Sequence, residues 1–404
     1  MIHYEEALRI ALDAVRPLDA ERRPTRAAAG LVLAADAVAR CDLPPFDRAA
    51  MDGYAVRSSD LAAPGRELVV VGEALAGRPA PVGPAPGECV RVFTGAVVPE
   101  GADAVVMQEL TSRSPREGCV RFEEPACAGE DIALRGEDVR AGEVLMRAGT
   151  VLGAAEVGLA TAADVPELAV VPRPTVSIVS TGNELVPAGT PLRAGAIRDA
   201  NGPALAARLA SAGLAVEFLG VARDEAGELS DILARGLAAD CLIVSGGVSV
   251  GEHDLVPEAL AGLGVGLRFE SVAIKPGKPT KFGMKGQKAV FGVPGNPVSA
   301  LVVTEFLVLP ILRRMAGVKD AAPRPRRGVL SRDVRKKPGR MLFAPGRLVE
   351  DGRGCRVEPV ESHGSADLVA YSRADVVFTL PADADGAPAG AKVEFYPREG
   401  RGLA

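Results

Sequence analysis

The residues best suited to chemistry lie where a buried-type apolar run meets a cluster of glycines. Residues 241–245 are Cys-Leu-Ile-Val-Ser, and the glycines of residues 246–251 follow directly. Backbone N–H groups can approach an anion closely in such a turn, because glycine has no Cβ atom in the way. The pattern favours a phosphate-binding turn, although a tight strand-to-helix turn without a ligand has the same shape. The candidate contacts are Ser245, Gly246, Gly247, Ser249 and Gly251.

Two other motif assignments compete for these segments. Residues 247–251 match the Gly-x-Ser-x-Gly nucleophile elbow of hydrolases. A hydrolase triad needs a later acid and then a histidine, and the later histidines are His253, four residues away, and His363 in a separate β-rich tail. Residues 277–280 resemble the end of a Walker loop, but Val272 stands where that loop requires its first glycine. Both alternatives are therefore disfavoured.

A cationic segment follows at residues 274–281, where Lys275, Lys278 and Lys281 recur at three-residue intervals. Two prolines and a glycine between them forbid a regular helix, so the segment must be a loop or an edge strand. Closely spaced cations repel one another unless an anion binds between them. We interpret Lys275 and Lys278 as contacts for a phosphate or another oxyanion, with a solvated charged loop as the alternative.

Three acids, Glu184, Asp224 and Asp254, each follow a predicted strand or its glycine turn. The carboxyl ends of parallel strands share one sheet edge, so these acids could converge there beside the lysines. Carboxylates near a bound phosphate are the arrangement through which Mg²⁺ acts. They are therefore candidate catalytic and metal-binding residues, although each one alone could equally be a helix cap or a solvated side chain.

Polar turns in residues 44–138 add further candidates. Asp52 lies in a segment of turn formers and aromatics, residues 44–56, that precedes a predicted strand. Thr94 ends another strand and could offer its hydroxyl and nearby N–H groups to an oxyanion, while a plain turn explains it equally well. Arg135, in residues 135–138, has the same ambiguity.

Apolar periodicity indicates the elements that must position these residues. Residues 4–15 repeat apolar side chains at helical spacing, and we expect this helix to pack against a second one at residues 151–163. Residues 37–147 have short β-like runs separated by glycine and proline. Beyond residue 327 the helical signal is gone, and short strands indicate a small β-barrel or sandwich.

Between these regions, short apolar runs alternate with helical stretches, which is typical of a parallel sheet in a three-layer α/β/α domain. The expected strands are residues 175–180, 216–221, 241–245 and 289–293, and the helices include residues 203–212 and 298–315.

Composition sets outer limits on function. A chain of 404 residues predicts two to four packed units. Its net charge of -5, from 47 basic and 52 acidic residues, offers no basic field for a nucleic acid. Six cysteines without a C-x-x-C pair suggest reduced thiols, and no leader or apolar run of membrane-spanning length is apparent. We expect a cytoplasmic enzyme without nucleic-acid or membrane partners.

The motifs, taken in order along the chain, resemble the molybdopterin molybdenumtransferase family, which includes the bacterial MoeA protein and the gephyrin E domain. The resemblance spans nearly the whole chain and adds Pro294 and Asn296 as candidate cofactor-binding residues. It rests on residues 44–56, 94–96, 135–138, 245–252, 275–279 and 294–297.

The resemblance implies a multidomain α/β plus β fold. A discontinuous helical linker domain would comprise residues 1–26 and 140–170, and a β-rich insertion domain residues 27–139. A three-layer α/β/α molybdopterin-binding domain would span residues 171–320, and a C-terminal β-barrel residues 321–404.

The resemblance also implies an activity. The substrates would be molybdate and adenylylated molybdopterin, the product AMP, and the metal Mg²⁺ or Zn²⁺. Asp52, Thr94, Glu184, Asp224 and Asp254 would be catalytic, with the last three also binding metal. Lys275, Lys278 and Arg135 would contact anions, and Ser249 would be a turn residue rather than a nucleophile.

The same resemblance implies a homodimer whose active site crosses the subunit interface and contacts with other molybdenum cofactor biosynthesis proteins. Asn183 stands where many relatives carry Asp, and residues 362–367 match the family's tail turn only loosely. A receptor-binding scaffold, as in gephyrin, is a rival hypothesis, but no linked N-terminal G domain accompanies this chain. Adenylylation by a related single-domain fold is disfavoured by the two β-rich units.

Overall fold

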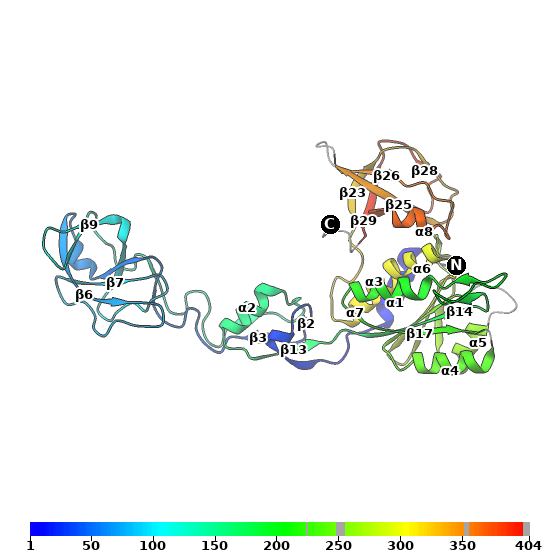
Figure 1. Cartoon of the computed structure of the whole chain (residues 1–404), viewed down its shortest axis with the longest axis horizontal. Coiled ribbons are helices and arrows are strands. Elements are labelled where there is room, and N and C mark those ends of the chain that lie inside the picture. The colour runs from blue at the N-terminus through cyan, green and yellow to red at the C-terminus, as the bar shows by residue number, and fades with distance from the viewer. Residues whose placement is uncertain (224, 248–254, 351–354, 399–404) are drawn as a thin grey trace. The chain divides into compact units, whose positions relative to one another are not determined.

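The computed structural model describes residues 1–223, 225–247, 255–350 and 355–398. The chain forms two compact units (Figure 1). Unit 1 comprises Met1–Glu21 and Val171–Ala404, and unit 2 comprises Arg22–Val170. Within the described residues, no helix is long and apolar enough to cross a membrane. Each unit has its own hydrophobic clusters and is considered separately below.

Unit 1 contains a six-stranded sheet in the order β17-β14-β18-β22-β21-β19. Its first four strands are parallel, and β14, β18 and β22 are almost wholly buried, because helices cover both faces. Strand β21 runs antiparallel to both of its neighbours, β22 and β19, and a two-residue turn at Gly286 folds it back onto β22. The four predicted strands are parallel, as expected, whereas this antiparallel edge was not predicted. The bounds are β14 Thr175–Thr181, β17 Ala215–Ala222, β18 Cys241–Ser245, β19 Gly266–Phe269, β21 Lys281–Lys285 and β22 Lys288–Val293.

Alternation along the strands sends neighbouring side chains to opposite helical layers. Ile178 and Ile243 pack with α3 (Asn201–Ser211) and with the chain from α6 onward, whereas Val179 and Val244 pack with α4 and α5. The three-layer α/β/α architecture is therefore confirmed. The remaining helices of these layers are α4 Ala226–Gly236, α5 Leu255–Gly262, α6 Pro297–Val303 and α7 Leu309–Met315.

The predicted helix at residues 298–315 is present, but a π-helical turn at Thr304–Val308 separates α6 from α7. Pro310 has no N–H to donate to the Phe306 carbonyl, the acceptor that a regular helix would assign to it. The hydroxyl of Tyr4 takes that place and donates to the Phe306 carbonyl over 3.1 Å. A proline-induced gap in this helix is thus filled by a residue 302 positions away in sequence.

Helix α1 (Tyr4–Ala14) consequently belongs to the α/β layers, where Ala7 and Ala11 are fully buried. The expected pairing with residues 151–163 was wrong, because an amphipathic stripe shows that a helix needs a partner without specifying which one. Helix α2 (Ala154–Ala162) instead buries Ala160 in a small cluster within unit 2. The domain boundaries at residues 27, 140, 171 and 321 stay a prediction.

The end of the chain forms a closed barrel of five strands, because β25 pairs with both β26 and β27. Strand β20 (Ile274–Lys275) adds to its edge, parallel to β25. A short helix, α8 (Leu368–Ser372), was not predicted, since five residues are too few to show a period. The barrel strands are β23 Arg326–Leu330, β25 Met341–Glu350, β26 Cys355–Pro359, β27 Val376–Leu380 and β29 Lys392–Pro397.

Unit 2 is β-rich, as expected, and its main sheet has the order β8-β5-β7-β6-β10-β9. A smaller sheet joins β1 (Glu21–Pro24), β13 (Glu167–Val171) and β2 (Val32–Leu33). The bounds in the main sheet are β5 Gly53–Val56, β6 Arg66–Ala74, β7 Glu88–Val92, β8 Ala104–Met107, β9 Thr111–Arg113 and β10 Cys119–Phe122.

Candidate functional site

The parallel strands of unit 1 bring three predicted motifs to one sheet edge. Ser180 of β14 pairs with Ser245 of β18, which in turn pairs with Val293 of β22. These strands end within a residue of this line, so Glu184, the Ser245–Gly247 turn and the turn at residues 294–296 emerge together. The N–H of Gly246 donates to the Val293 carbonyl over 3.1 Å. Carboxyl ends of parallel strands are where open α/β sheets bind their ligands.

The glycine turn is tightly built at Gly246, whose φ is +92°. A Cβ atom at Gly246 would lie 2.5 Å from the Thr181 carbonyl oxygen, so no other residue fits there without a backbone shift. The Thr181 hydroxyl lies beside this turn, is buried, and has no hydrogen-bond partner among the described residues. The predicted contacts Ser249 and Gly251 lie outside the described residues.

A buried polar network links the two turns. The side-chain N–H groups of Asn201 donate to the Ser245 hydroxyl and to the Gly295 carbonyl, each over 2.8 Å. Asp199 accepts from the backbone N–H groups of Asn201 and Gly202 and from the Ser180 hydroxyl, each over 3.1 Å. We did not predict either residue. Asp and Asn just before a helical stretch are a capping signal that could have found them.

The lysine loop reaches the same edge. Strand β21 begins at Lys281, which pairs with Gly292, the residue before the last of β22. The loop of residues 276–280 therefore enters the sheet at its carboxyl edge. Lys275 and Lys278 are exposed, but the Lys281 side chain is only 7% exposed and lies 3.5 Å from a carboxylate oxygen of Glu270. Two lysines rather than three are available to an anion in solution.

The predicted acids are only partly placed. Glu184 is exposed, and its carboxylate lies over Gly182, where a Cβ atom would come within 2.6 Å of it. Asp224 and Asp254 lie outside the described residues. In the part of the chain that is described, no three His, Cys, Asp or Glu side chains are grouped so that they could hold a metal ion. Glu184 is thus the one predicted metal ligand among the described residues.

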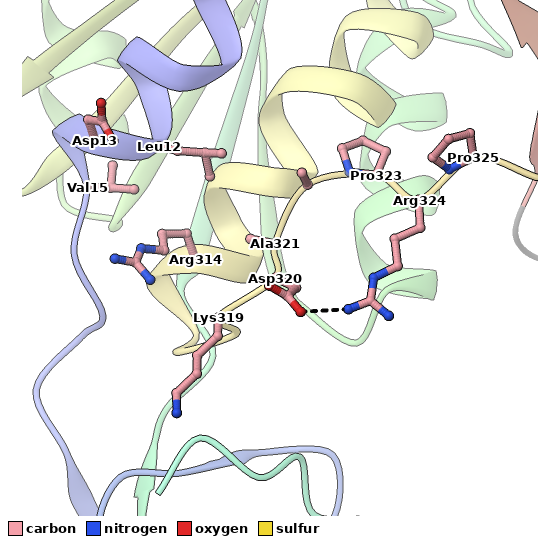
Figure 2. Close-up of a pocket in the computed structure, with 11 residues that line it drawn as sticks. Leu12, Asp13, Val15, Arg314, Lys319, Asp320, Ala321, Pro323, Arg324 and Pro325 are labelled. Atoms are coloured by element: carbon pink, nitrogen blue, oxygen red, sulfur yellow. Dashed lines mark hydrogen bonds and ion pairs between the residues drawn. The ribbon is translucent and has the colours of Figure 1, made fainter. Parts of the chain in front are cut away.

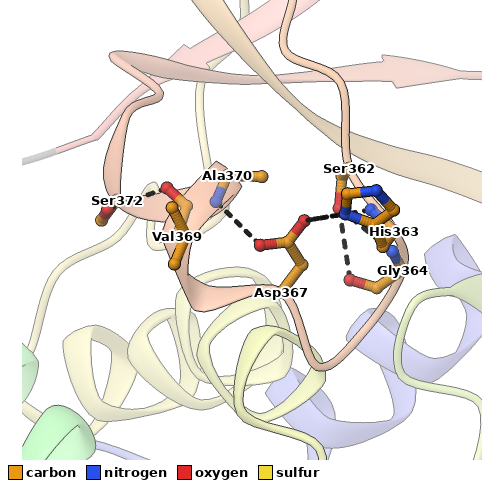
Figure 3. Close-up of polar contacts among 7 residues, drawn as sticks. All are labelled: Ser362, His363, Gly364, Asp367, Val369, Ala370 and Ser372. Carbon is orange, nitrogen blue, oxygen red and sulfur yellow. Dashed lines mark hydrogen bonds and ion pairs between the residues drawn. The ribbon is translucent and has the colours of Figure 1, made fainter.

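A loop of the barrel lies against the turn that contains Pro294 and Asn296. The side-chain N–H of Asn296 donates to the Ser365 hydroxyl over 2.7 Å, and the backbone N–H of Val298 donates to the Ser365 carbonyl. Asp367 holds this loop in shape: its carboxylate accepts from the N–H groups of Ala370 and His363, which lower its pKa (Figure 3). The tail turn at residues 362–367 therefore borders the edge of the sheet, whereas Pro294 itself is buried.

In unit 2, the Asp52 carboxylate accepts hydrogen bonds from the Thr94 hydroxyl over 2.6 Å and from the Thr94 N–H over 2.8 Å. The hydrogen bond from the Thr94 hydroxyl is the largest effect that lowers the pKa of Asp52, and the bond from the Thr94 N–H is the next. Burial raises this pKa, and the positive charge of Arg91 lowers it slightly. Asp52 is thus a carboxylate at neutral pH and is held in one orientation.

Arg135 is anchored elsewhere in unit 2. Its Nε lies 2.5 Å from the Asp42 carboxylate, and its backbone N–H donates to Asp47 over 2.7 Å. Residues 94–96 join the same segment, because the Gly95 N–H donates to the Ala49 carbonyl over 2.8 Å, so the three predicted motifs of unit 2 lie close together. The Arg135 guanidinium is 66% exposed and therefore still accessible to an anion.

A separate cavity of about 680 Å³ lies at the C-terminal ends of α1 and α7 (Figure 2). Leu12, Arg314 and Lys319 line it, and Arg324 pairs there with Asp320 over 2.8 Å. The long helix that begins after Asn296 ends here, so this cavity is at the far end of that helix from the glycine turn. None of the predicted site residues lines it.

The fold and this sheet edge are those of a multidomain α/β protein with a parallel sheet, a class whose ligands bind beyond the carboxyl ends of the strands. Family models narrow it. The MoeA N-terminal region (domains I and II) matches residues 2–163, a probable molybdopterin-binding domain matches residues 177–314, and the MoeA C-terminal region (domain IV) matches residues 327–397.

Individual relatives agree along the whole length. Molybdopterin molybdenumtransferase 2 of Mycobacterium tuberculosis is 35% identical, covering 98% of this chain and 99% of that protein. Molybdopterin molybdenumtransferase of Haemophilus influenzae is 34% identical, covering 94% of each. A crystal structure of the molybdopterin biosynthesis MoeA protein from Pyrococcus horikoshii is 31% identical, with a TM-score of 0.81 over 98% of this chain and 100% of that one. The chain belongs to the molybdopterin molybdenumtransferase family, and its enzyme class is that of a transferase in molybdenum cofactor biosynthesis.

Replacing Thr94 tests the electrostatics of Asp52. Thr94→Val removes the hydroxyl donor, so the pKa of Asp52 should rise toward its ordinary value, whereas Thr94→Ser should keep it low. Because the folded-state pKa is depressed, the contact stabilises the fold above the unfolded-state pKa and is lost as pH falls through the folded one. A carbon-13 titration of the Asp52 carboxyl measures this, and equal values in both variants would contradict the assignment.

Gly246→Ala tests the packing of the glycine turn. The added methyl would meet the Thr181 carbonyl, and the positive φ adds strain, so the free energy of unfolding should fall by about 3 kcal/mol or more. Gly286→Ala is the matched control, since Gly286 has φ +59° and nothing within 4 Å of a new Cβ. It should lose only about 1 kcal/mol in the same urea titration. Similar losses in both variants would show that the turn is not sterically closed.

Proposed function

We propose that the chain inserts molybdate into adenylylated molybdopterin, releases AMP, and does so in the cytoplasm. Family membership supports the overall reaction. The observation that carries the proposal is the common edge of β14, β18 and β22, which gathers a glycine turn, Glu184 and the entry of a lysine loop. These are groups suited to an anionic substrate.

The proposed division of labour follows from charge. The N–H groups of the Ser245–Gly247 turn, together with Lys275 and Lys278, bind the oxyanions of the substrate without having to transfer a proton. Glu184, with Asp224 and Asp254, positions the reacting groups near the pyrophosphate linkage. Pro294 and Asn296 shape the neighbouring turn, which the barrel holds through Ser365.

We propose Mg²⁺ as the divalent cation, with Zn²⁺ as the alternative. Carboxylate oxygens are the ligands that Mg²⁺ prefers, and it would supply charge neutralisation at the phosphates. The described residues contribute only Glu184 to that ligand set, so no step of the reaction is assigned to the metal here.

We further propose that the enzyme is a homodimer in which Asp52 of the partner subunit and Thr94 of the partner subunit complete the active site. The support is chemical: Asp52 is a fixed carboxylate of lowered pKa in a unit separate from the sheet edge. Arg135 would add an anion contact from the same unit. Contacts with other proteins of molybdenum cofactor biosynthesis would deliver the substrate and accept the product.

The central prediction concerns AMP. Purified enzyme given adenylylated molybdopterin, molybdate and Mg²⁺ should release AMP only when molybdate is present, as measured by chromatography. Lys275→Ala should lower kcat/KM by about tenfold to a hundredfold, because it removes a charged anion contact. The matched control is Lys285→Ala, an exposed lysine at the other end of β21, which should leave turnover unchanged. Absence of molybdate-dependent AMP release would overturn the proposed function.

Subunit mixing tests the shared site. Asp52→Ala and Glu184→Ala proteins should each be inactive, and co-refolding or subunit exchange should restore activity, because each heterodimer then has one intact site. Native mass spectrometry can establish that heterodimers have formed. Inactive heterodimers would mean that all catalytic groups act within one chain.

A further inference from the structure

We infer that Asn201 is a positioning residue: its amide fixes the separation between the Ser245–Gly247 turn and the turn at residues 294–296, and so sets the width of the anion-binding edge. The expected effect on the reaction rests on the proposed function, whereas the role of Asn201 in holding the two turns together does not. Asn201 contacts no predicted substrate group through its own side chain.

The two hydrogen bonds of Asn201 are well formed and buried. One amide group donates at 2.8 Å to the Ser245 hydroxyl at the end of β18 and at 2.8 Å to the Gly295 carbonyl after β22. Asn201 is 9% exposed and Ser245 is 1% exposed. A buried carbonyl or hydroxyl that loses its partner costs about 1 to 3 kcal/mol, so this arrangement is strongly favoured over a separated pair of turns.

Asn201 is itself held from behind. Asp199 accepts from the backbone N–H groups of Asn201 and Gly202 and from Ser180 on β14. The start of α3 is thereby tied to β14 while the Asn201 amide reaches β18 and the residues after β22. One short segment therefore links the ends of three strands, independently of the backbone ladder.

Only an amide suits this position. Asp would place two acceptors beside the Gly295 carbonyl, and Ser or Ala could not span both partners. Gly295 lies close enough to the glycine turn that a Cβ atom there would be 3.8 Å from the Gly246 Cα. A small change in the distance between the turns would therefore alter the N–H groups that face a substrate anion.

The test compares Asn201→Ala with Asp240→Ala. Asp240 accepts two hydrogen bonds from Thr175, over 2.7 and 2.8 Å, at the opposite end of β14 and β18, so the control loses the same number of side-chain bonds in the same sheet. Hydrogen–deuterium exchange should increase in residues 245–247 and 294–297 of Asn201→Ala and not of Asp240→Ala. The Gly246 N–H, bonded to the Val293 carbonyl, is the reporting amide.

Kinetics separate positioning from plain stability. Asn201→Ala should raise KM for adenylylated molybdopterin about tenfold with a smaller effect on kcat, as expected when ground-state and transition-state binding fall together. Asp240→Ala should lower the melting temperature without changing KM. If Asn201→Ala does not fold, Ser245→Ala removes one of the two partners and should show the same pattern more weakly.

Unchanged exchange at both turns overturns the inference, and so does faster exchange with unaltered KM and kcat. If the wild-type enzyme releases no AMP, the proposed function fails, and the exchange experiment then decides whether Asn201 fixes the two turns.

Discussion

The parallel register of β14, β18 and β22 is the constraint on which the site in unit 1 depends. Each strand is buried on both faces, so its position is set by two helical layers and by both neighbouring strands. A slip of one residue would exchange the side chains of the two faces. The strand ends therefore cannot move independently, and the turns that follow them inherit that precision. This gives a rigid base for groups that bind an anion.

The rigid sheet edge requires polar groups to be buried within a largely apolar domain, and each such group needs a hydrogen-bond partner. Most of these groups are satisfied: Asp199, Asn201, Ser180 and Ser245 bond to one another or to backbone. The Thr181 hydroxyl is the exception at this edge within the described residues. Buried hydroxyls are normally bonded, so one without a partner beside a glycine turn is consistent with a position that faces a ligand.

The sequence predicted the four parallel strands because they are short, mostly apolar runs, which are typical of strands covered by helices, but it did not predict β19 and β21. The sequence predicted the helix α1 but not its packing partner, because an apolar stripe fits several partners. The deciding interaction was the Tyr4 hydroxyl with the Phe306 carbonyl, and it depends on Pro310 leaving that acceptor open. No periodicity links residues so far apart. The short helix α8 was missed for the opposite reason, since its signal is only the Asp367 cap.

Candidate site residues were found where glycine, lysine or acid follows a strand, because strand ends are visible in the sequence. Asn201 was missed because it stands just before the helix predicted at residues 203–212 and looks like an ordinary capping residue. Its side chain in fact faces inward, toward Ser245 and Gly295, while Asp199 accepts from the first two backbone N–H groups of α3. Two polar residues separated by Ala200 thus have two tasks: Asp199 accepts from the N–H groups at the helix start, and Asn201 joins the strand ends. That division is settled only when the strands are assembled, which is why a single sequence shows the residue types but not their roles.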